Sequence, residues 1–388
     1  MAIQIPMEME KKRMKLDNSV LKNEERAIFQ LRSLYRKYGY SQYKMSKFEE
    51  YDLYIRNKDF LVSDNIITFN DTDGRLLALK PDVTLSIIKN SGDIQGYVKK
   101  VYYNENVYRV SKGSQSFKEI MQVGLECIGD IDDYNICEVV MLAAESLAGI
   151  SEDYILDISH MGIVAEAMET IGVSGAGKKE IFKCIAEKNL HQIANICKNE
   201  GVEQSLADNL IAIVTCCGKA DEAIAELERI VKGEEGMNAL NQLKNIMNAL
   251  SSGGYADKIR IDFSVIHDIN YYNGIVFKGF INGIPTGILS GGQYDLLMKK
   301  MKKNTGAIGF AVYLDMLERL QDDDIKFDVD TVILYDSDTT IDQLNSVVKS
   351  FTDDKKSVSA QKCVPEKMRY KQLVRLKEGR LEILEYNS

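Results

Sequence analysis

The sequence has few of the residues from which metal sites are built. It contains only three histidines, and its seven cysteines are odd in number and include no C-x-x-C pair. Structural metal sites combine several Cys and His ligands at close spacings, so no metal cluster is expected. Cys184, Cys197 and Cys217 fall on the apolar faces of helical patterns. These residues are expected to be buried thiols of a protein in the reducing cytoplasm.

Long apolar runs and an excess of positive charge are also missing. No run approaches the ~20 apolar residues that a membrane-spanning helix needs. The first 18 residues are charged and lack an apolar core, so a signal peptide is not expected either. The net charge is -9 and the pI about 5.2. The chain therefore has no overall positive field for nucleic acid, although an acidic protein can still carry a local basic groove.

The residues that are present predict two or three domains in a chain of 388 residues with 45% hydrophobic content. Residues 23–38 follow helical spacing and Gly39 ends the pattern, and a further core helix is expected over residues 135–149. Residues 163–250 are helical throughout, which predicts a helical insertion, and the chain re-enters a sheet at 259–263. Asp322, Asp323 and Asp324 form a charged linker into a small α/β tail: a strand at 332–335, a helix near 341–351 and a hairpin at Glu378-Gly379.

One glycine-rich stretch inside the helical region imitates a phosphate-binding loop. Gly172 to Lys179 reads Gly-Val-Ser-Gly-Ala-Gly-Lys-Lys. A P-loop needs Ser or Thr after its lysine and a buried strand before its first glycine. Lys179 and an amphipathic helix occupy those places, so a turn between two helices is expected.

Polar side chains alternate along a strand pair in the first half of the chain. Residues 101–109 predict a strand, a polar loop begins at Ser111, and a return strand carries Gln122, Gly124 and Glu126 on one face by period two. An amide and a carboxylate that project into the same space suit an imidazole or an ammonium group. Polar alternation on a half-solvated sheet would give the same pattern.

A second carboxylate precedes a helix. The turn at Asp73-Gly74 leads into an apolar strand and then into a helix started by Pro81. Asp82 and Thr84 stand at that junction, where they could bind an ammonium. Acidic residues also favour helix N-termini for purely electrostatic reasons, and this alternative stays open.

The third candidate group lies between residues 260 and 319. Tyr271 and Tyr272 adjoin the strand-forming residues 275–277, and Gly291-Gly292 lets a backbone pass close to a ligand. Adjacent residues on a strand point to opposite faces, so one tyrosine can face a site while the other packs. Plain packing of both rings is the alternative.

These motifs, in this order, resemble the class II aminoacyl-tRNA synthetases, and the tyrosine pair and the Gly-Gly-Gln-Tyr-Asp run at 291–295 resemble histidyl-tRNA synthetases in particular. The resemblance covers about residues 20–320. It implies an α+β fold in which an antiparallel sheet is flanked by helices. Residues 40–51 resemble the motif 1 strand of the dimer interface. The implied domains are the synthetase-like core at 1–160 and 256–322, the helical insertion at 161–255, and a small C-terminal α/β domain at 326–388.

Several family positions that carry charge have changed. The motif 2 arginine survives as Arg109, which is the candidate for residual anion binding. Ser111 replaces an acidic residue, and Arg319, roughly one helical turn beyond Met316, is a candidate substitute for the motif 3 arginine. Three arginines of the family are replaced. Met316 aligns with the arginine of motif 3, His267 with the arginine before the tyrosine pair, and Gln293 with the arginine after Gly-Gly. Because amino-acid activation needs cations on the phosphates of ATP, the loss of three should abolish it.

The residues that hold histidine in the family keep competent chemistry here. They are Asp82, Thr84, Gln122, Glu126, Tyr271 and Tyr272. This combination resembles the regulatory subunit of ATP phosphoribosyltransferase, a paralogue of histidyl-tRNA synthetase in histidine biosynthesis. The resemblance implies L-histidine as effector and a separate short catalytic subunit as partner. It also implies a homodimer within a hetero-octamer, no catalysis by this chain and no cofactor. A divergent, active histidine-tRNA ligase is the alternative, and an unrelated amino-acid enzyme on the same fold is a third.

Overall fold

The computed structural model describes residues 21–61, 65–92, 95–110, 116–266, 271–319, 327–364 and 366–387, without the side chains of residues 59, 318 and 319. Contacts divide the chain into two compact units, Met1–Leu320 and Gln321–Ser388. The acidic linker at 322–324 lies outside the described residues. Among the described residues, none of the helices has the length and apolar character needed to span a membrane.

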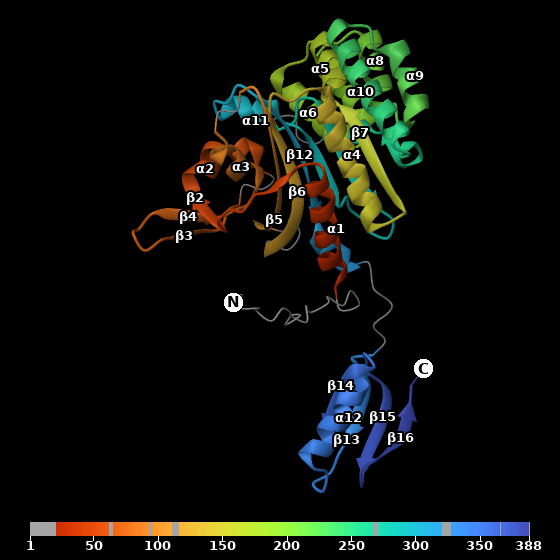
Figure 1. Ribbon diagram of the computed structural model, residues 1–388. Helices are drawn as coiled ribbons and strands as arrows, with labels where there is room; N and C mark the ends of the chain where they lie inside the picture. Colours follow the sequence, from red (N-terminus) through yellow and green to blue (C-terminus); the bar gives the residue numbers. More distant parts are fainter. Residues whose placement is uncertain are drawn as a thin grey trace, which may run out of the picture. The chain divides into compact units, whose positions relative to one another are not determined.

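A nine-stranded sheet forms the centre of the first unit (Figure 1). Its neighbouring strands are antiparallel except for the pairs β1–β5 and β7–β9, which are parallel. In spatial order the strands are β1 (Ser41–Gln42), β5 (Val98–Val110), β6 (Phe117–Gly129), β12 (Gly306–Tyr313), β11 (Leu289–Gln293), β10 (Ile275–Ile281), β7 (Tyr154–His160), β9 (Ile259–Ile261) and β8 (Gly218–Lys219). The neighbouring strands β6 and β12 thus come from distant parts of the chain.

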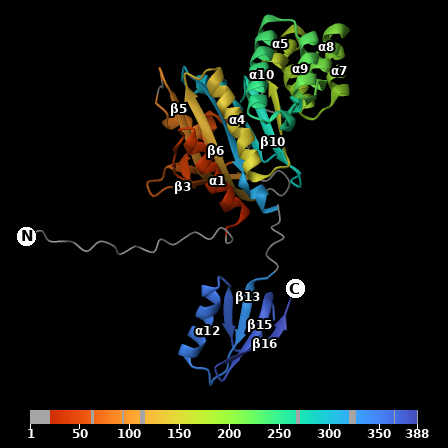
Figure 2. The same cartoon turned by 45° about the vertical axis from the view of Figure 1, so that its right-hand side comes forward.

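Two long helices pack against one face of this sheet (Figure 2). They are α1 (Asn23–Lys37) and α4 (Asp133–Ile150), and both were predicted from helical spacing. Val123, Leu125 and Cys127 of β6 are buried in the core on this side. The alternate residues of β6, including Gln122 and Glu126, therefore point to the opposite face.

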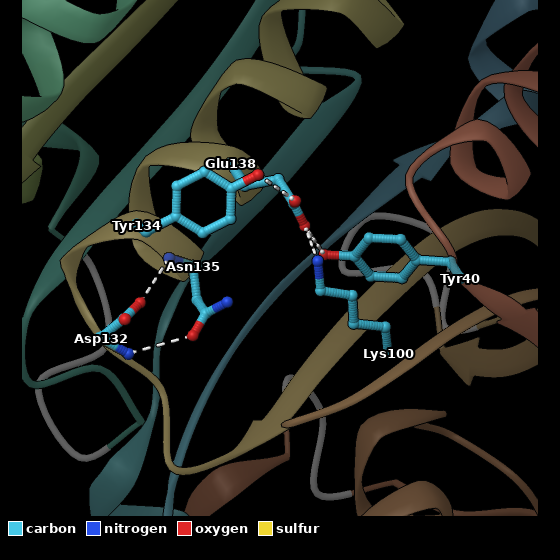
Figure 3. Close-up of polar contacts among 6 residues, drawn as sticks. All are labelled: Tyr40, Lys100, Asp132, Tyr134, Asn135 and Glu138. Atoms are coloured by element: carbon cyan, nitrogen blue, oxygen red, sulfur yellow. Dashed lines mark hydrogen bonds and ion pairs between the residues drawn. The ribbon is translucent and has the colours of Figure 1, made fainter. Parts of the chain in front are cut away.

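A buried carboxylate fastens α4 to the edge of the sheet. Glu138 accepts hydrogen bonds from the Lys100 ammonium at 2.6 Å, from the Tyr134 hydroxyl at 3.2 Å and from the Tyr40 hydroxyl at 3.3 Å (Figure 3). Asp132 Oδ1 caps the start of the helix by accepting a hydrogen bond from the backbone N–H of Asn135. Because Glu138 is only 5% exposed, these donors replace the water that would otherwise hydrogen-bond its carboxylate.

The opposite side carries a smaller layer. A three-stranded antiparallel sheet, β2-β4-β3, lies there beside two short helices (Figure 1). The elements are β2 (Phe48–Glu50), α2 (Tyr51–Arg56), a 3₁₀ turn (Lys58–Phe60), β3 (Thr68–Asn70), β4 (Leu76–Leu79) and α3 (Thr84–Asn90). The turn predicted at Asp73-Gly74 joins β3 to β4, and Gly74 has a positive φ of 80°.

Six helices form the insertion between β7 and β9 and gather beside β7 (Figure 1). They are α5 (Met161–Thr170), α6 (Gly175–Ala186), α7 (Leu190–Asn199), α8 (Gln204–Thr215), α9 (Ala220–Ile230) and α10 (Glu234–Ser252). The segment that imitates a P-loop is a turn between α5 and α6, where Ser174 caps α6 by accepting from the Gly177 amide. That expectation is confirmed.

The second unit is a four-stranded sheet with one helix. Its strand order is β14-β13-β15-β16, and α12 (Ile341–Asp353) packs on one face. The strands are β13 (Val329–Leu334), β14 (Val358–Gln361), β15 (Tyr370–Lys377) and β16 (Arg380–Tyr386). The predicted hairpin at Glu378-Gly379 is confirmed, because these two residues join β15 to β16.

Four local predictions were wrong. Residues 40–51 do not form one strand, because β1 and β2 belong to different sheets. The helix expected at Pro81 begins at Thr84. Residues 163–250 are not helical throughout, because the two-residue strand β8 lies among the helices. A 3₁₀ segment, Leu314–Arg319, follows β12. Cys217 is exposed, unlike Cys184 and Cys197, because α8 ends at Thr215.

Candidate ligand-binding site

The face of the large sheet opposite α4 holds a cavity of about 270 Å³. All the residues selected from the sequence line it: Asp82, Thr84, Arg109, Gln122, Glu126, Tyr271 and Tyr272. They come from β5, β6, the start of α3 and the segment before β10. The remaining lining residues are Leu61, Val83, Tyr103, Ser290, Tyr294, Gly309, Phe310, Ala311 and Tyr313.

Glu126 lies at the centre of the cavity's polar contacts. Thr84 Oγ1 donates to Glu126 Oε1 at 2.7 Å, and the Tyr294 hydroxyl donates to Oε2. Burial raises the pKa of the Glu126 carboxyl to about 8, although both hydrogen bonds oppose the shift. The carboxyl therefore holds a proton at neutral pH until a cationic group enters the cavity.

Glycine on the neighbouring strand makes room for this carboxyl. Gly309 of β12 pairs with Glu126 in the sheet. A Cβ at position 309 would overlap with Glu126 Oε2 and with the Leu125 carbonyl oxygen. Gly124 likewise leaves room for the Tyr103 hydroxyl, because a Cβ at position 124 would overlap with the hydroxyl oxygen.

Asp82 is held at the junction before α3. Its Oδ1 accepts from the Leu85 amide at 2.9 Å, and its Oδ2 lies 4.0 Å from the Arg109 guanidinium. Burial raises the pKa of Asp82, and the Arg109 charge and the backbone donors offset part of that rise. Arg109 Nε also donates to the Pro81 carbonyl at 2.8 Å, so this arginine fixes the segment that carries Asp82.

Gln122 brings an unused donor to the cavity. Its side chain is only 2% exposed, and Nε2 has no hydrogen-bond partner among the residues that the structure describes. A buried amide hydrogen without an acceptor is unfavourable by about 1–3 kcal/mol, so a ligand that supplies an oxygen would be stabilised here.

The tyrosines form a connected aromatic wall. The rings of Tyr271 and Tyr272 lie 4.7 Å apart, and Tyr271 lies 5.7 Å from Tyr294. The tyrosine pair precedes β10, which starts at Ile275. Because the pair stands on a turn, both rings line the cavity, which agrees with the placement of both tyrosines in the site by the family resemblance.

Sequence reasoning missed Tyr103 and Tyr294. Tyr103 pairs with Gly124 across β5 and β6, so it shares the face already assigned to Gln122 and Glu126. That pairing was the available signal. Tyr294 stands in the Gly-Gly-Gln-Tyr-Asp run, but its contact with Glu126 spans 168 residues of sequence and has no local signature.

Two of the positions that lost arginine, Gln293 and Met316, contribute no charge to the cavity. Gln293 donates to Asp295 at 2.8 Å and is not a lining residue. Met316 packs against the main core, where its sulfur accepts from Thr286. Ser111, His267 and the Arg319 side chain lie outside what the structure describes. Among the described lining residues, Arg109 is the one cation.

Comparison with known proteins agrees with this geometry. Residues 15–317 match the model of the family described as histidyl-tRNA synthetase. The chain belongs to the histidyl-tRNA synthetase family. Membership confirms the class II synthetase fold predicted from the motif order.

Curated relatives include proteins named ATP phosphoribosyltransferase regulatory subunit. The ATP phosphoribosyltransferase regulatory subunit of Oceanobacillus iheyensis is 27% identical over 293 residues, which cover 75% of this chain and 72% of the relative. The protein of the same name from Acetivibrio thermocellus is 27% identical over 314 residues, 79% of this chain and 75% of the relative. The predicted resemblance to this branch is confirmed.

Solved structures have the same fold. An ATP phosphoribosyltransferase regulatory subunit/histidyl-tRNA synthetase from Bacillus halodurans superposes with a TM-score of 0.75 at 22% identity, covering 96% of this chain and 99% of that one. A chain of the ATP phosphoribosyl transferase (HisG:HisZ) complex from Thermotoga maritima superposes with a TM-score of 0.60 at 18% identity. The match covers 75% of this chain and 97% of that one.

Proposed function

We propose that this chain is a non-catalytic regulatory subunit of ATP phosphoribosyltransferase, and that it binds L-histidine in the cavity around Glu126. It acts on a separate short catalytic subunit. The proposal rests on the composition of the cavity. Its lining includes the six residues that correspond to the histidine-holding positions of the family, and Arg109 is the single cation among the described lining residues. The names of the curated relatives support the same function.

The chemistry of the cavity suits one amino acid with a basic side chain. Asp82 offers a carboxylate to the ligand ammonium, with Thr84 and Gln122 nearby. Glu126 and the tyrosines can exchange hydrogen bonds with an imidazole, which both donates and accepts. Drug-sized ligands occupy pockets of roughly 300–1,000 Å³, so a cavity of about 270 Å³ suits a single small metabolite.

The same composition argues against amino-acid activation. Transfer of an adenylyl group needs several cations to stabilise the charge that develops on the departing pyrophosphate. Gln293 and Met316 stand where the family places arginines, and neither side chain can supply that charge. Loss of one such contact typically slows a reaction by 10²–10³-fold, and losses of several should leave no measurable activation.

Pyrophosphate exchange distinguishes the regulator from the ligase. We expect the purified chain to show no histidine-dependent exchange between ATP and labelled pyrophosphate above the rate without enzyme. An authentic histidyl-tRNA synthetase assayed in parallel serves as the positive control. Clear histidine-dependent exchange would return the assignment to the ligase.

Calorimetry tests the ligand directly. We expect L-histidine to bind the wild-type chain and to bind Glu126→Ala roughly ten- to a hundredfold more weakly, because removal of a charged hydrogen-bond partner costs about 1.5–3 kcal/mol. Glu119→Ala is the matched control, since Glu119 lies on the same strand but is exposed. Absence of binding by the wild type would show the cavity to be a relic of descent.

A further inference from the structure

The second unit ends in a strand that is open along its outer side. β16 pairs with β15 on one side, and within the described residues no strand pairs with the other. All seven residues of β16 are exposed. Large apolar side chains are prominent among them: Ile383 is 67% exposed and Tyr386 62%. An edge strand of this kind is a template for pairing with another chain.

The two faces of β16 differ in chemistry. Leu381 and Ile383 stand opposite Leu376 and Val374, which pack beneath α12. Cross-strand partners share a face, so Leu381 and Ile383 extend the apolar layer of that face beyond the helix.

The other face of the strand is charged. Arg380, Glu382 and Glu385 stand opposite Lys377, Arg375 and Leu373 of β15. The register shifts between Leu373 and Val374, which leaves Leu384 without a partner. This extra residue brings Arg380 and Glu385 to the same face although they are five positions apart.

The charges on this face are arranged to complement a second copy of the strand. Arg380 lies at the start of β16 and Glu385 near its end. In an antiparallel pair of identical strands, the start of one copy lies beside the end of the other. Arg380 of each copy would then meet Glu385 of the other, and the apolar rows of the two copies become continuous. Glu382 lies near the two-fold axis beside its counterpart, so two pairs of opposite charge are set against one pair of like charge.

The interior of the unit gives a reason for such pairing. Its buried apolar side chains form two clusters of three: Val332, Leu334 and Leu373 on one face, and Ile333, Val374 and Leu376 on the other. Residues 321–388 contain a single cysteine, Cys363, so no disulfide can form within the unit. Domains this small usually gain stability from cross-links, metals or association.

We propose that the C-terminal units of two copies of this chain associate edge to edge through antiparallel β16 strands, forming one continuous eight-stranded sheet. This interface does not depend on the histidine cavity or on the proposed function. It concerns only the second unit, and the occupant of the edge is another copy of the same strand.

Thiol cross-linking of the full-length chain tests the pairing. The exposed native thiols are first removed as Cys217→Ser and Cys363→Ser. In that background Ile383→Cys places a thiol near the middle of β16, where two paired copies approach each other. Ile341→Cys is the control, on α12 of the same unit and 77% exposed. We expect a short bis-maleimide to join Ile383→Cys chains at least about tenfold faster, because paired strands hold the two thiols at high local concentration.

Charge reversal supplies an independent readout. Added to Ile383→Cys, Arg380→Glu should slow cross-linking roughly three- to tenfold, and Arg380→Glu with Glu385→Arg should restore it. Equal cross-linking rates at positions 383 and 341 would overturn the proposal. A cross-linking rate at position 383 that Arg380→Glu leaves unchanged would also overturn it. Cross-linking of position 383 to an added catalytic subunit in place of its own copy would assign the edge to that partner and also overturn it.

Discussion

Glu126 is the residue whose state depends most on what the cavity contains. Its folded pKa of about 8 lies above the ordinary value of 4.5 because burial disfavours the charged form. The folded chain thus binds this proton more tightly than the unfolded chain does. The resulting stabilisation is fully present below pH about 4.5 and is lost as the pH rises through about 8.

Glu126→Gln therefore separates charge from shape. The amide stays neutral at every pH, so we expect the variant and the wild type to differ little in melting temperature near pH 5. Above pH 8 the wild type should melt at a lower temperature than the variant, by several degrees. A pH series of thermal melts without ligand measures the difference.

The control for this series is Glu119→Gln, which changes an exposed carboxylate on the same strand. Its melting temperature should follow the wild type at every pH. If the Glu126→Gln curve also ran parallel to the wild type from pH 5 to 9, the buried proton would contribute nothing to stability.

Individual residues show how much of the site could be predicted from the sequence. Gln122 and Glu126 were found because a strand's period of two assigns them to one face without any knowledge of the fold. Asp82 and Thr84 were found from their place before a helix. The bond from Tyr294 to Glu126 could not be found this way, because only the pairing of β12 with β6 and β11 brings those residues together.

At the scale of elements, the approach of β12 to β6 determines the floor of the cavity. Gly309→Ala would place a methyl group against the Glu126 carboxyl and the Leu125 carbonyl. We expect overpacking to destabilise the fold by about 1–3 kcal/mol and histidine binding to weaken at least about tenfold. Chemical denaturation and calorimetry measure the two effects.

Gly149→Ala is the matched control for that substitution. Gly149 lies in the last turn of α4, and a Cβ there meets nothing within 4 Å. Alanine in a helix should raise stability by roughly 0.5–1 kcal/mol and leave histidine affinity unchanged. Unchanged binding by Gly309→Ala as well would mean that β12 can move without disturbing Glu126.

Elements with strong local signals were predicted well, and those defined by their partners were not. The spacing of apolar residues predicted α1 and α4, and glycines marked the turns before β4 and β16. The segment at 40–51 was misjudged because extended residues carry no mark of which sheet they join. Tyr271 and Tyr272 were placed correctly at the site but not on a strand, because β10 begins only after them at Ile275.

At the scale of the whole molecule, the proposed regulatory function requires this chain to act through its partner, because the proposal assigns it no catalysis of its own. We expect saturating amounts of this chain to change the rate at which the short catalytic subunit transfers phosphoribosyl from phosphoribosyl pyrophosphate to ATP. Histidine should then shift that rate, with binding couplings typically of about 1–3 kcal/mol. Steady-state kinetics with and without histidine measure both effects.

Glu126→Ala provides the control within the complex. The variant should still change the partner's rate, because Glu126 is buried in the cavity. It should respond to histidine only at much higher concentrations. Wild-type chain that left the partner's kinetics unaltered at saturation would contradict the regulatory function itself.

The order in which the large sheet is assembled has a consequence for the protein during its synthesis. β6 leaves the ribosome long before β12, which follows about 180 residues later, and at roughly 5–20 residues per second the delay is about 10–35 s. Throughout that interval the nascent chain displays an unpaired strand edge with Glu126 on it. The insertion is translated in the meantime. The cavity around Glu126 therefore forms only after β12 has been translated, and until then this strand edge is exposed to chaperones and to neighbouring nascent chains.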